Sequence, residues 1–178
     1  MHIHKNIISS DSYIPKIEPF INTSLIKVLT GQRRVGKSYL LFQLMNLISE
    51  KENNANIIYI NLEDLTFDHI KTAKDLNEYV IKNLSSTHPN YVFVDEIQDV
   101  DDFEKALRSL AINDNIDIYI TGSNAKMLSG ELATTLSGRY IEFTVYSLSY
   151  LEFLKFHTLD NSDDSLALFI KYGGLPYI

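Results

Sequence analysis

Eight consecutive residues carry the most specific chemical signal in this sequence. They match the pattern G-x-x-x-x-G-K-[ST] in full, and they are Gly31, Gln32, Arg33, Arg34, Val35, Gly36, Lys37 and Ser38. The glycines let the backbone curve with its N–H groups turned inward, which makes a concave site for anions. In such a loop Lys37 reaches the β- and γ-phosphates of a nucleotide, and the Ser38 hydroxyl is a ligand for Mg²⁺. We therefore predict a phosphate-binding loop (P-loop); the alternative is a surface loop with accidental glycines.

Two acids follow an apolar run later in the chain, where Tyr91–Asp95 is succeeded by Glu96. An aspartate at the carboxyl end of such a strand holds Mg²⁺ through water, so we assign Asp95 to the metal. Glu96 is then placed to orient and deprotonate an attacking water. Taken alone this pair is a weak signal, because many strands end in acidic turns. Its distance from the P-loop favours the functional interpretation.

A third polar group follows the apolar run Ile118–Ile120, where Ser123 and Asn124 come just after a Thr-Gly pair. Ligands in open α/β sheets bind beyond the carboxyl ends of the strands. Either side chain there could contact the γ-phosphate or hold the water. The alternative is that one of them caps the next helix, and the sequence does not choose between the two residues.

Arg139 precedes the last apolar run of the core. An arginine at this position could reach the nucleotide of a neighbouring subunit and stabilise charge in the transition state. That interpretation predicts a homo-oligomer, and the alternative is a solvated or salt-bridged side chain. Arg33 and Arg34 lie inside the P-loop, where surface exposure is the simplest expectation for their side chains.

The elements that position these residues alternate between β-rich runs and helical patterns, which is typical of a parallel α/β sheet. Continuous runs predict strands buried on both faces, whereas the alternation in the last run predicts a half-exposed edge strand. The expected strands are Leu25–Thr30, Asn56–Asn61, Tyr91–Asp95, Ile116–Thr121 and, at the edge, Tyr140–Tyr146.

Apolar residues at three- and four-residue spacing predict the helices between these strands. One begins near Gly36 and ends before Asn53. The others contain Leu76 to Leu84, Phe103 to Ala111 (with Asp101 or Asp102 as N-cap), Met127 to Ser137, Leu148 to Phe156 and Ser165 to Tyr172. We accordingly expect a core at residues 1–146 with a short N-terminal extension. Residues 147–178 then form a helical segment, the start of a lid or of a C-terminal region.

Composition excludes several classes of protein. The 178 residues are 45% hydrophobic and 22% charged, as in an ordinary globular domain, and contain no cysteine. This excludes disulfides and thiolate chemistry, and it fits a cytoplasmic location. No apolar stretch is long enough for a signal peptide or a membrane span. The net charge of −7 argues against a nucleic-acid footprint over the whole domain.

The motifs together resemble a family. Their order resembles that of prokaryotic AAA-superfamily ATPases that pair an N-terminal ATPase core with a C-terminal domain of poorly understood function. The matching stretches are Thr30–Ser38, Tyr91–Gln98, Ile120–Leu128, Ser137–Tyr140, Ser147–Phe153 and Tyr172–Pro176.

The resemblance implies a three-layer P-loop NTPase fold of the additional-strand class, with five strands in the order 5-1-4-3-2. It implies ATP and Mg²⁺ as ligands, Ser123 or Asn124 as the first sensor, and Arg139 as an arginine finger. Relatives in this family are longer, so the chain resembles a core that lacks a C-terminal domain. No arginine fits the second sensor of the superfamily's lid.

The function predicted from all this is an Mg-ATPase that drives a conformational change in an attached domain or protein partner. One alternative is a nucleotide-gated binding module with little turnover. Another is a small-molecule kinase, although Glu96 beside Asp95 favours water over a hydroxyl acceptor. Nucleic-acid binding has no support in this segment, since basic residues do not form a stripe with aromatics.

Overall fold

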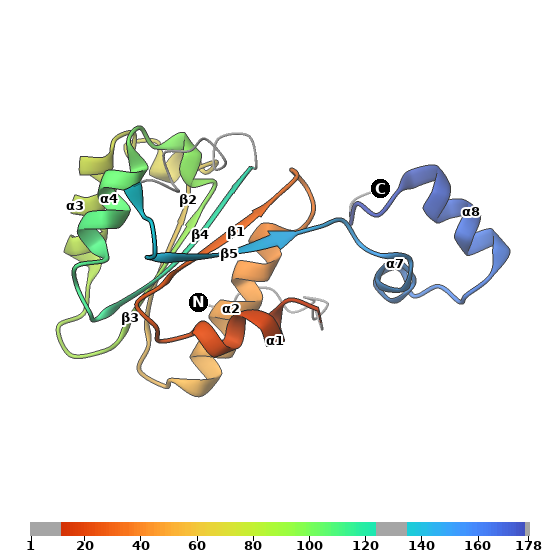
Figure 1. Ribbon diagram of the computed structural model, residues 1–178, viewed down its shortest axis with the longest axis horizontal. Helices are drawn as coiled ribbons and strands as arrows, with labels where there is room; N and C mark the ends of the chain where they lie inside the picture. Colours follow the sequence, from red (N-terminus) through yellow and green to blue (C-terminus); the bar gives the residue numbers. More distant parts are fainter. Residues whose placement is uncertain (1–11, 124–134, 177–178) are drawn as a thin grey trace.

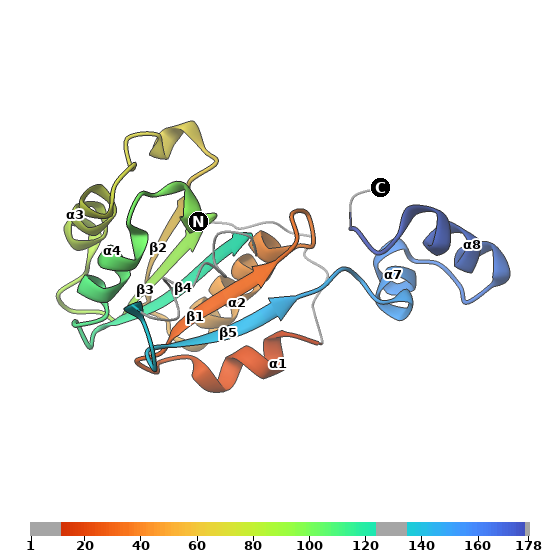
Figure 2. The ribbon, with the colours of Figure 1, turned by 45° about the horizontal axis from the view of Figure 1, so that its top comes forward.

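The computed structural model describes residues 12–123 and 135–176, and its centre is a five-stranded sheet in the order β2-β3-β4-β1-β5. Every neighbouring pair is parallel, and Figure 2 shows the strands side by side with β5 at one edge. The predicted strand order and fold class are therefore confirmed. The strands are β1 (Ile26–Gly31), β2 (Asn56–Asn61), β3 (Asn90–Asp95), β4 (Ile116–Ser123) and β5 (Tyr140–Val145).

The three central strands β1, β3 and β4 are buried almost throughout, as continuous apolar runs predict. The edge strand β5 is half-exposed, as expected from its alternation. The prediction was wrong for β2, in which only Ile58 and Ile60 are fully buried. This strand forms the other edge of the sheet, where the flanking helices cover it less completely than they cover the centre.

Helices lie on both faces of the sheet and make the molecule three-layered (Figure 1). The α-helices are α1 (Ile14–Ile17), α2 (Lys37–Lys51), α3 (Ala73–Asn83), α4 (Phe103–Leu110), α7 (Tyr150–His157) and α8 (Asp163–Tyr172). Short 3₁₀ helices are η1 (Glu18–Phe20), η2 (Leu65–Phe67) and η3 (Ile97–Asp99). Helices α3 and α4 pack on one face and α1 and α2 on the other. The helix expected at Met127–Ser137 falls largely outside the described residues.

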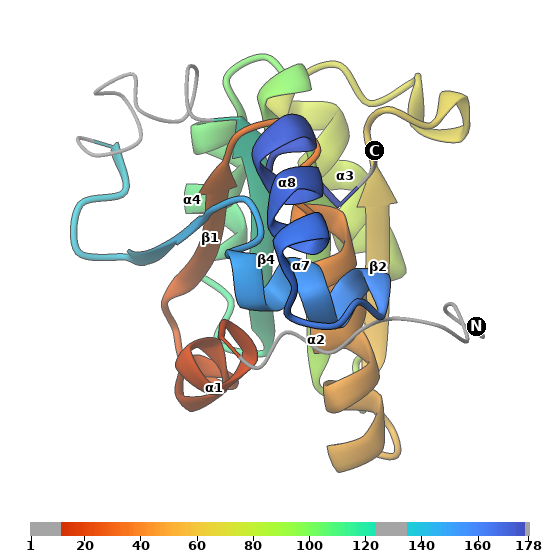
Figure 3. The same cartoon turned by 90° about the vertical axis from the view of Figure 1, so that its right-hand side faces the viewer.

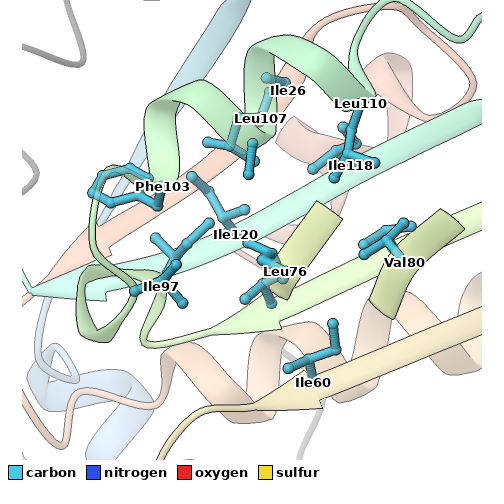
Figure 4. Packing of buried hydrophobic residues seen from close by; sticks show 14 of the residues in the cluster. Ile26, Ile60, Leu76, Val80, Ile97, Phe103, Leu107, Leu110, Ile118 and Ile120 are labelled. Carbon is cyan, nitrogen blue, oxygen red and sulfur yellow. The ribbon is translucent and has the colours of Figure 1, made fainter. Parts of the chain in front are cut away.

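The core under α3 and α4 follows from helical spacing. Phe103, Leu107 and Leu110 of α4 lie on one face of the helix and pack on the β4 residues Ile118 and Ile120 (Figure 4). Each such side chain, when fully buried, stabilises the fold by roughly 1.5–3 kcal/mol before entropy is counted. This layer therefore holds the carboxyl ends of β3 and β4 in a fixed relation.

Local signals explain where the helices begin and end. Helix α2 begins after Gly36 and ends at Lys51, as predicted. Thr72 and Asp75 form a reciprocal capping box at the start of α3. Asp102 occupies the N-cap of α4, but its carboxylate bonds Lys105 instead of a backbone N–H.

Helices α7 and α8 form a pair that is set apart from the sheet, beyond the carboxyl end of β5 (Figures 1 and 3). Ser149 and Glu152 form a capping box that starts α7. The Leu148 N–H donates to the carbonyl of Gly174 at 2.7 Å, which brings the two ends of the pair together. A Cβ on Gly174 would lie 2.1 Å from the Leu148 carbonyl oxygen, so this approach requires glycine. Among the described residues, no helix has the length and apolarity that crossing a membrane requires.

A buried ion pair lies at the amino ends of the central strands. Lys27 of β1 has no exposed surface, and its ammonium group contacts the carboxylate of Asp117 on β4. Asp117 also accepts hydrogen bonds from the Tyr119 hydroxyl at 2.8 Å and from the Asn22 N–H at 2.8 Å. Burial lowers the pKa of Lys27, while the Asp117 carboxylate opposes that change. The pair is stable because its polar atoms are satisfied by several partners.

Candidate nucleotide site

The predicted site residues converge because the strands are parallel. The P-loop follows β1 and the two acids follow β3, so both begin at the same edge of the sheet. In open α/β sheets this carboxyl edge is where ligands bind. The structure thus brings together residues that lie about sixty positions apart in the chain.

The shape of the P-loop depends on close approach and on left-handed backbone. A Cβ on Gly31 would lie 2.3 Å from the carbonyl oxygen of Val145 on β5, so only glycine fits there. Arg34 and Gly36 have φ angles of 68° and 102°. Glycine adopts such angles readily, whereas at Arg34 they are uncommon and typical of a tightly curved loop.

The amino end of α2 is suited to bind an anion. Gly36 is its N-cap and provides no side-chain cap, and no acidic residue lies in the first turn. The first N–H groups of a helix need partners from outside it, and the helix dipole makes that end positive. Ser38 lies in this turn, half-buried. The residues present therefore fit a phosphate group with a bound cation.

Lys37 is held inside the loop. Its side chain is 3% exposed, and its Nζ donates to the carbonyl oxygens of Gly31 and Gln32, each at 3.2 Å. The same Nζ lies 3.6 Å from Oε1 of Glu96. The P-loop lysine and the predicted base are therefore in direct electrostatic contact across β1 and β3.

Asp95 is buried at the end of β3, with 2% of its surface exposed. The Thr121 hydroxyl donates to its Oδ1, and the Tyr59 hydroxyl donates to its Oδ2 at 3.2 Å. Burial and the neighbouring carboxylate raise the pKa of Tyr59, so its hydroxyl stays protonated and remains a donor. Each carboxylate oxygen keeps a second lone pair, which suits Asp95 to accept from a metal-bound water.

Glu96 has an unusual backbone. Its φ is 56°, in the left-handed region, and its N–H donates to the Thr121 hydroxyl oxygen at 2.9 Å. Its carboxylate accepts from the side-chain amide of Gln98. The chain turns sharply at this residue, because β3 ends at Asp95 and η3 begins at Ile97. The turn directs the Glu96 carboxylate toward Lys37.

Ser123 is the last residue of β4 and lies in register with Gly31. This position puts Ser123 beside the first residue of the P-loop, at the same sheet edge. Asn124, the other candidate for the first sensor, lies outside the described residues. The choice between them stays a prediction.

The arginines lie in different places. Arg33 and Arg34 are exposed at the tip of the P-loop, and Arg33 forms an ion pair with Glu63 at 2.6 Å. Arg139 is exposed at the opposite edge of the sheet, where its carbonyl oxygen accepts from the Ile26 N–H at 2.9 Å. A six-residue strand spans about 20 Å. Arg139 therefore does not reach the P-loop of its own subunit, and its role between subunits stays a prediction.

Three polar residues at the site were not assigned a role from the sequence. They are Tyr59 and Thr121, which bond Asp95, and Gln98, which bonds Glu96. Gln98 was available from its spacing, two positions after Glu96 on a predicted turn. Tyr59 and Thr121 lie on other strands, and their contacts depend on sheet register.

The strand order, the P-loop between β1 and α2, and the acids after β3 together define a P-loop nucleoside triphosphatase fold. Residues 23–154 match the model of the AAA domain family. Since this match covers most of the chain, the protein belongs to the AAA domain family. That membership supports nucleotide binding by the chain.

Two curated relatives are similar over most of the chain. An uncharacterized protein of Haemophilus influenzae is 39% identical over 180 residues, covering 98% of this chain and 45% of that protein. An uncharacterized protein of Methanocaldococcus jannaschii is 41% identical over 165 residues, covering 86% of this chain and 36% of that protein. The chain thus spans less than half the length of each of these relatives.

Solved structures with much lower identity share the fold. The Aeropyrum pernix ORC1 protein, solved in complex with DNA, has a TM-score of 0.61 at 12% identity, covering 89% of this chain and 54% of that one. AMPPCP-bound DnaA from Aquifex aeolicus has a TM-score of 0.54 at 15% identity, covering 94% and 59%. At these identities the likeness shows the fold alone.

Proposed function

We propose that the chain binds ATP with Mg²⁺ and hydrolyses the γ-phosphoanhydride, and that hydrolysis drives a conformational change in an attached domain or partner. The observation that supports this most directly is the contact between Lys37 and Glu96, 3.6 Å apart and both largely buried. A phosphate-binding cation and a carboxylate base are both needed at the same phosphoryl group. Here they meet at the sheet edge that α/β folds use for ligands.

Each residue has a defined part in the proposed reaction. The inward N–H groups of the P-loop and Lys37 bind the phosphates and offset their negative charge. Glu96 accepts a proton from the attacking water and orients it toward the γ-phosphorus. Ser38 and Asp95 would hold Mg²⁺, which when bound neutralises charge that develops on the phosphate oxygens.

The segment after β5 supports the proposed conformational change. Val145 lies in register with Gly31 and is separated from α7 by only four residues. Rearrangement of the P-loop is thus passed to α7 and α8 through a short connection. We propose residues 147–178 as the part that moves with nucleotide state, in agreement with their predicted assignment as the start of a lid or of a C-terminal region.

The test is steady-state hydrolysis of Mg-ATP by the 178-residue chain, with Glu96→Gln as the blank and with ATP binding measured in parallel. The proposal expects turnover above the blank, and ATP binding that Glu96→Gln retains and Lys37→Ala weakens by at least about tenfold. Binding without turnover above the blank would favour a nucleotide-gated binding module. Consumption of ATP that required an added hydroxyl acceptor would favour a kinase.

A further inference from the structure

Thr121 occupies a position on β4 that sequence patterns do not single out. Phe93 of β3 and Tyr119 of β4 are register partners whose rings stack with their centroids 4.5 Å apart. Side chains alternate between the two faces of a sheet, so residues two positions further along lie on the same face. Those residues are Asp95 and Thr121, and they meet at the carboxyl edge beside the P-loop.

The Thr121 hydroxyl makes two hydrogen bonds, one to each acidic residue. Its proton goes to Oδ1 of Asp95, and its oxygen accepts the backbone N–H of Glu96 at 2.9 Å. Thr121 has no exposed surface, so solvent does not compete for either bond. One hydroxyl on β4 therefore links the carboxylate of Asp95 to the backbone of Glu96.

The backbone of Glu96 gives this link its importance. A φ of 56° is unfavourable for a residue other than glycine, and such strain persists only where the surroundings hold it in place. The carbonyl oxygen of Glu96 accepts the Asp99 N–H at 3.1 Å, and its N–H is held by Thr121. The Thr121 hydroxyl is thus one of two hydrogen-bond partners that hold this residue in the left-handed conformation.

We propose that Thr121 is a positioning residue for ATP hydrolysis, whose hydroxyl keeps the metal-binding Asp95 and the base Glu96 in the relative orientation that the reaction requires. This inference rests on the proposed function, because both acids must act on the same phosphoryl group. Small displacements of a catalytic group reduce the rate much more than they reduce substrate binding. The P-loop binds the phosphates independently of Thr121, so ATP affinity should depend on it only weakly.

The experiment compares Thr121→Val, which keeps the shape and removes the hydroxyl, with Thr121→Ser, which keeps the hydroxyl. Ile120→Val is the matched control, because this neighbour on β4 points to the opposite core and shortens by one methylene group. Thermal unfolding establishes that each variant is folded, and Thr121→Ala replaces Thr121→Val if the valine variant does not fold. The readouts are kcat, KM for ATP, and the Mg²⁺ concentration that gives half-maximal turnover.

We expect Thr121→Val to lower kcat by at least about tenfold with a change in KM for ATP of about twofold or less. The Mg²⁺ requirement should rise, because Asp95 loses a partner. Thr121→Ser should restore most of kcat, and Ile120→Val should resemble the wild type. A Thr121→Val rate within about twofold of wild type would overturn the inference, as would a Thr121→Ser variant as impaired as the valine variant.

A second measurement separates failure of the inference from failure of the proposed function. If wild-type turnover does not exceed the Glu96→Gln blank, the proposed hydrolysis fails, and Thr121 is then tested by ATP binding with and without Mg²⁺. Mg²⁺ should strengthen ATP binding by the wild type more than by Thr121→Val. An equal effect of Mg²⁺ on both proteins would overturn the positioning role.

Discussion

The Nζ of Lys37 lies 3.6 Å from Oε1 of Glu96, although the two residues come from different strands and neither side chain is more than 11% exposed. The same ammonium group also contacts the carbonyl oxygens of Gly31 and Gln32. A nucleotide phosphate must therefore share Lys37 with a carboxylate that also repels the phosphate. The charge on Glu96 serves the proposed reaction at some cost to binding.

Neutralising Glu96 should separate these effects. We expect Glu96→Gln to abolish turnover and to tighten ATP binding by roughly three- to tenfold, because both the competition for Lys37 and the repulsion of phosphate are removed. Isothermal titration calorimetry or fluorescence of a labelled nucleotide measures the affinity. Asp102→Asn is the control, since it removes an exposed carboxylate that pairs with Lys105. Unchanged or weaker affinity in Glu96→Gln would contradict the prediction.

Gly31 should not tolerate a side chain. An added Cβ would meet the Val145 carbonyl oxygen at 2.3 Å, and both atoms belong to paired strands that cannot easily separate. We expect Gly31→Ala to lower the free energy of unfolding by about 1–3 kcal/mol and to displace β5. Gly138→Ala is the matched control: Gly138 also has positive φ, but its added Cβ meets nothing within 4 Å. Denaturant unfolding compares the two, and equal losses would show that the contact with Val145 is not the cause.

Arg139 lies at the edge of the sheet opposite the P-loop, so any contact with nucleotide must come from a neighbouring subunit. We expect the rate of ATP hydrolysis per subunit to rise with protein concentration, and Arg139→Ala to remove that rise and to lower the maximal rate by at least about tenfold. Arg108→Ala provides the control, because Arg108 is also exposed but lies on α4. A constant, non-zero rate at all concentrations would mean that a single subunit carries the whole catalytic set.

The buried pair of Lys27 and Asp117 should affect stability and leave nucleotide binding unchanged, because it lies at the amino ends of β1 and β4. Removing one partner of a buried pair leaves an uncompensated charge, and we expect Asp117→Asn to cost about 3–5 kcal/mol. The double variant Lys27→Met with Asp117→Asn should cost less than the single change. A measurement of unfolding by urea, with ATP affinity as the second readout, tests both statements.

The pH dependence of Asp117→Asn has a defined sign. Burial already lowers the pKa of Lys27, and loss of the carboxylate that opposes this effect lowers that pKa further. Between the lowered folded pKa and the ordinary lysine pKa, the unfolded chain binds more protons than the folded chain, so stability rises with pH. The deficit of Asp117→Asn relative to wild type should therefore shrink from neutral pH toward pH 10, and a deficit that stays constant would argue against a charged Lys27 as its cause.

Sequence patterns were sufficient for most of the fold. The P-loop from Gly31 to Ser38 and the acids after Tyr91 are local signals, and the alternation of strands and helices follows from apolar periodicity. These features depend on residues close together in the chain. The strand order came with the family resemblance. Burial of β2 was overestimated, because periodicity does not show how fully the neighbouring helices cover an edge strand.

The sequence by itself thus determined the class of fold and the residues that could bind phosphate, and the tertiary structure decided which of them meet. Thr121 reaches Asp95 across 26 positions of sequence because parallel register aligns the ends of β3 and β4. The direction of β5 likewise puts Arg139 at the far edge of the sheet. Register and strand direction are set by packing of the whole sheet between its helices, and no local pattern encodes them.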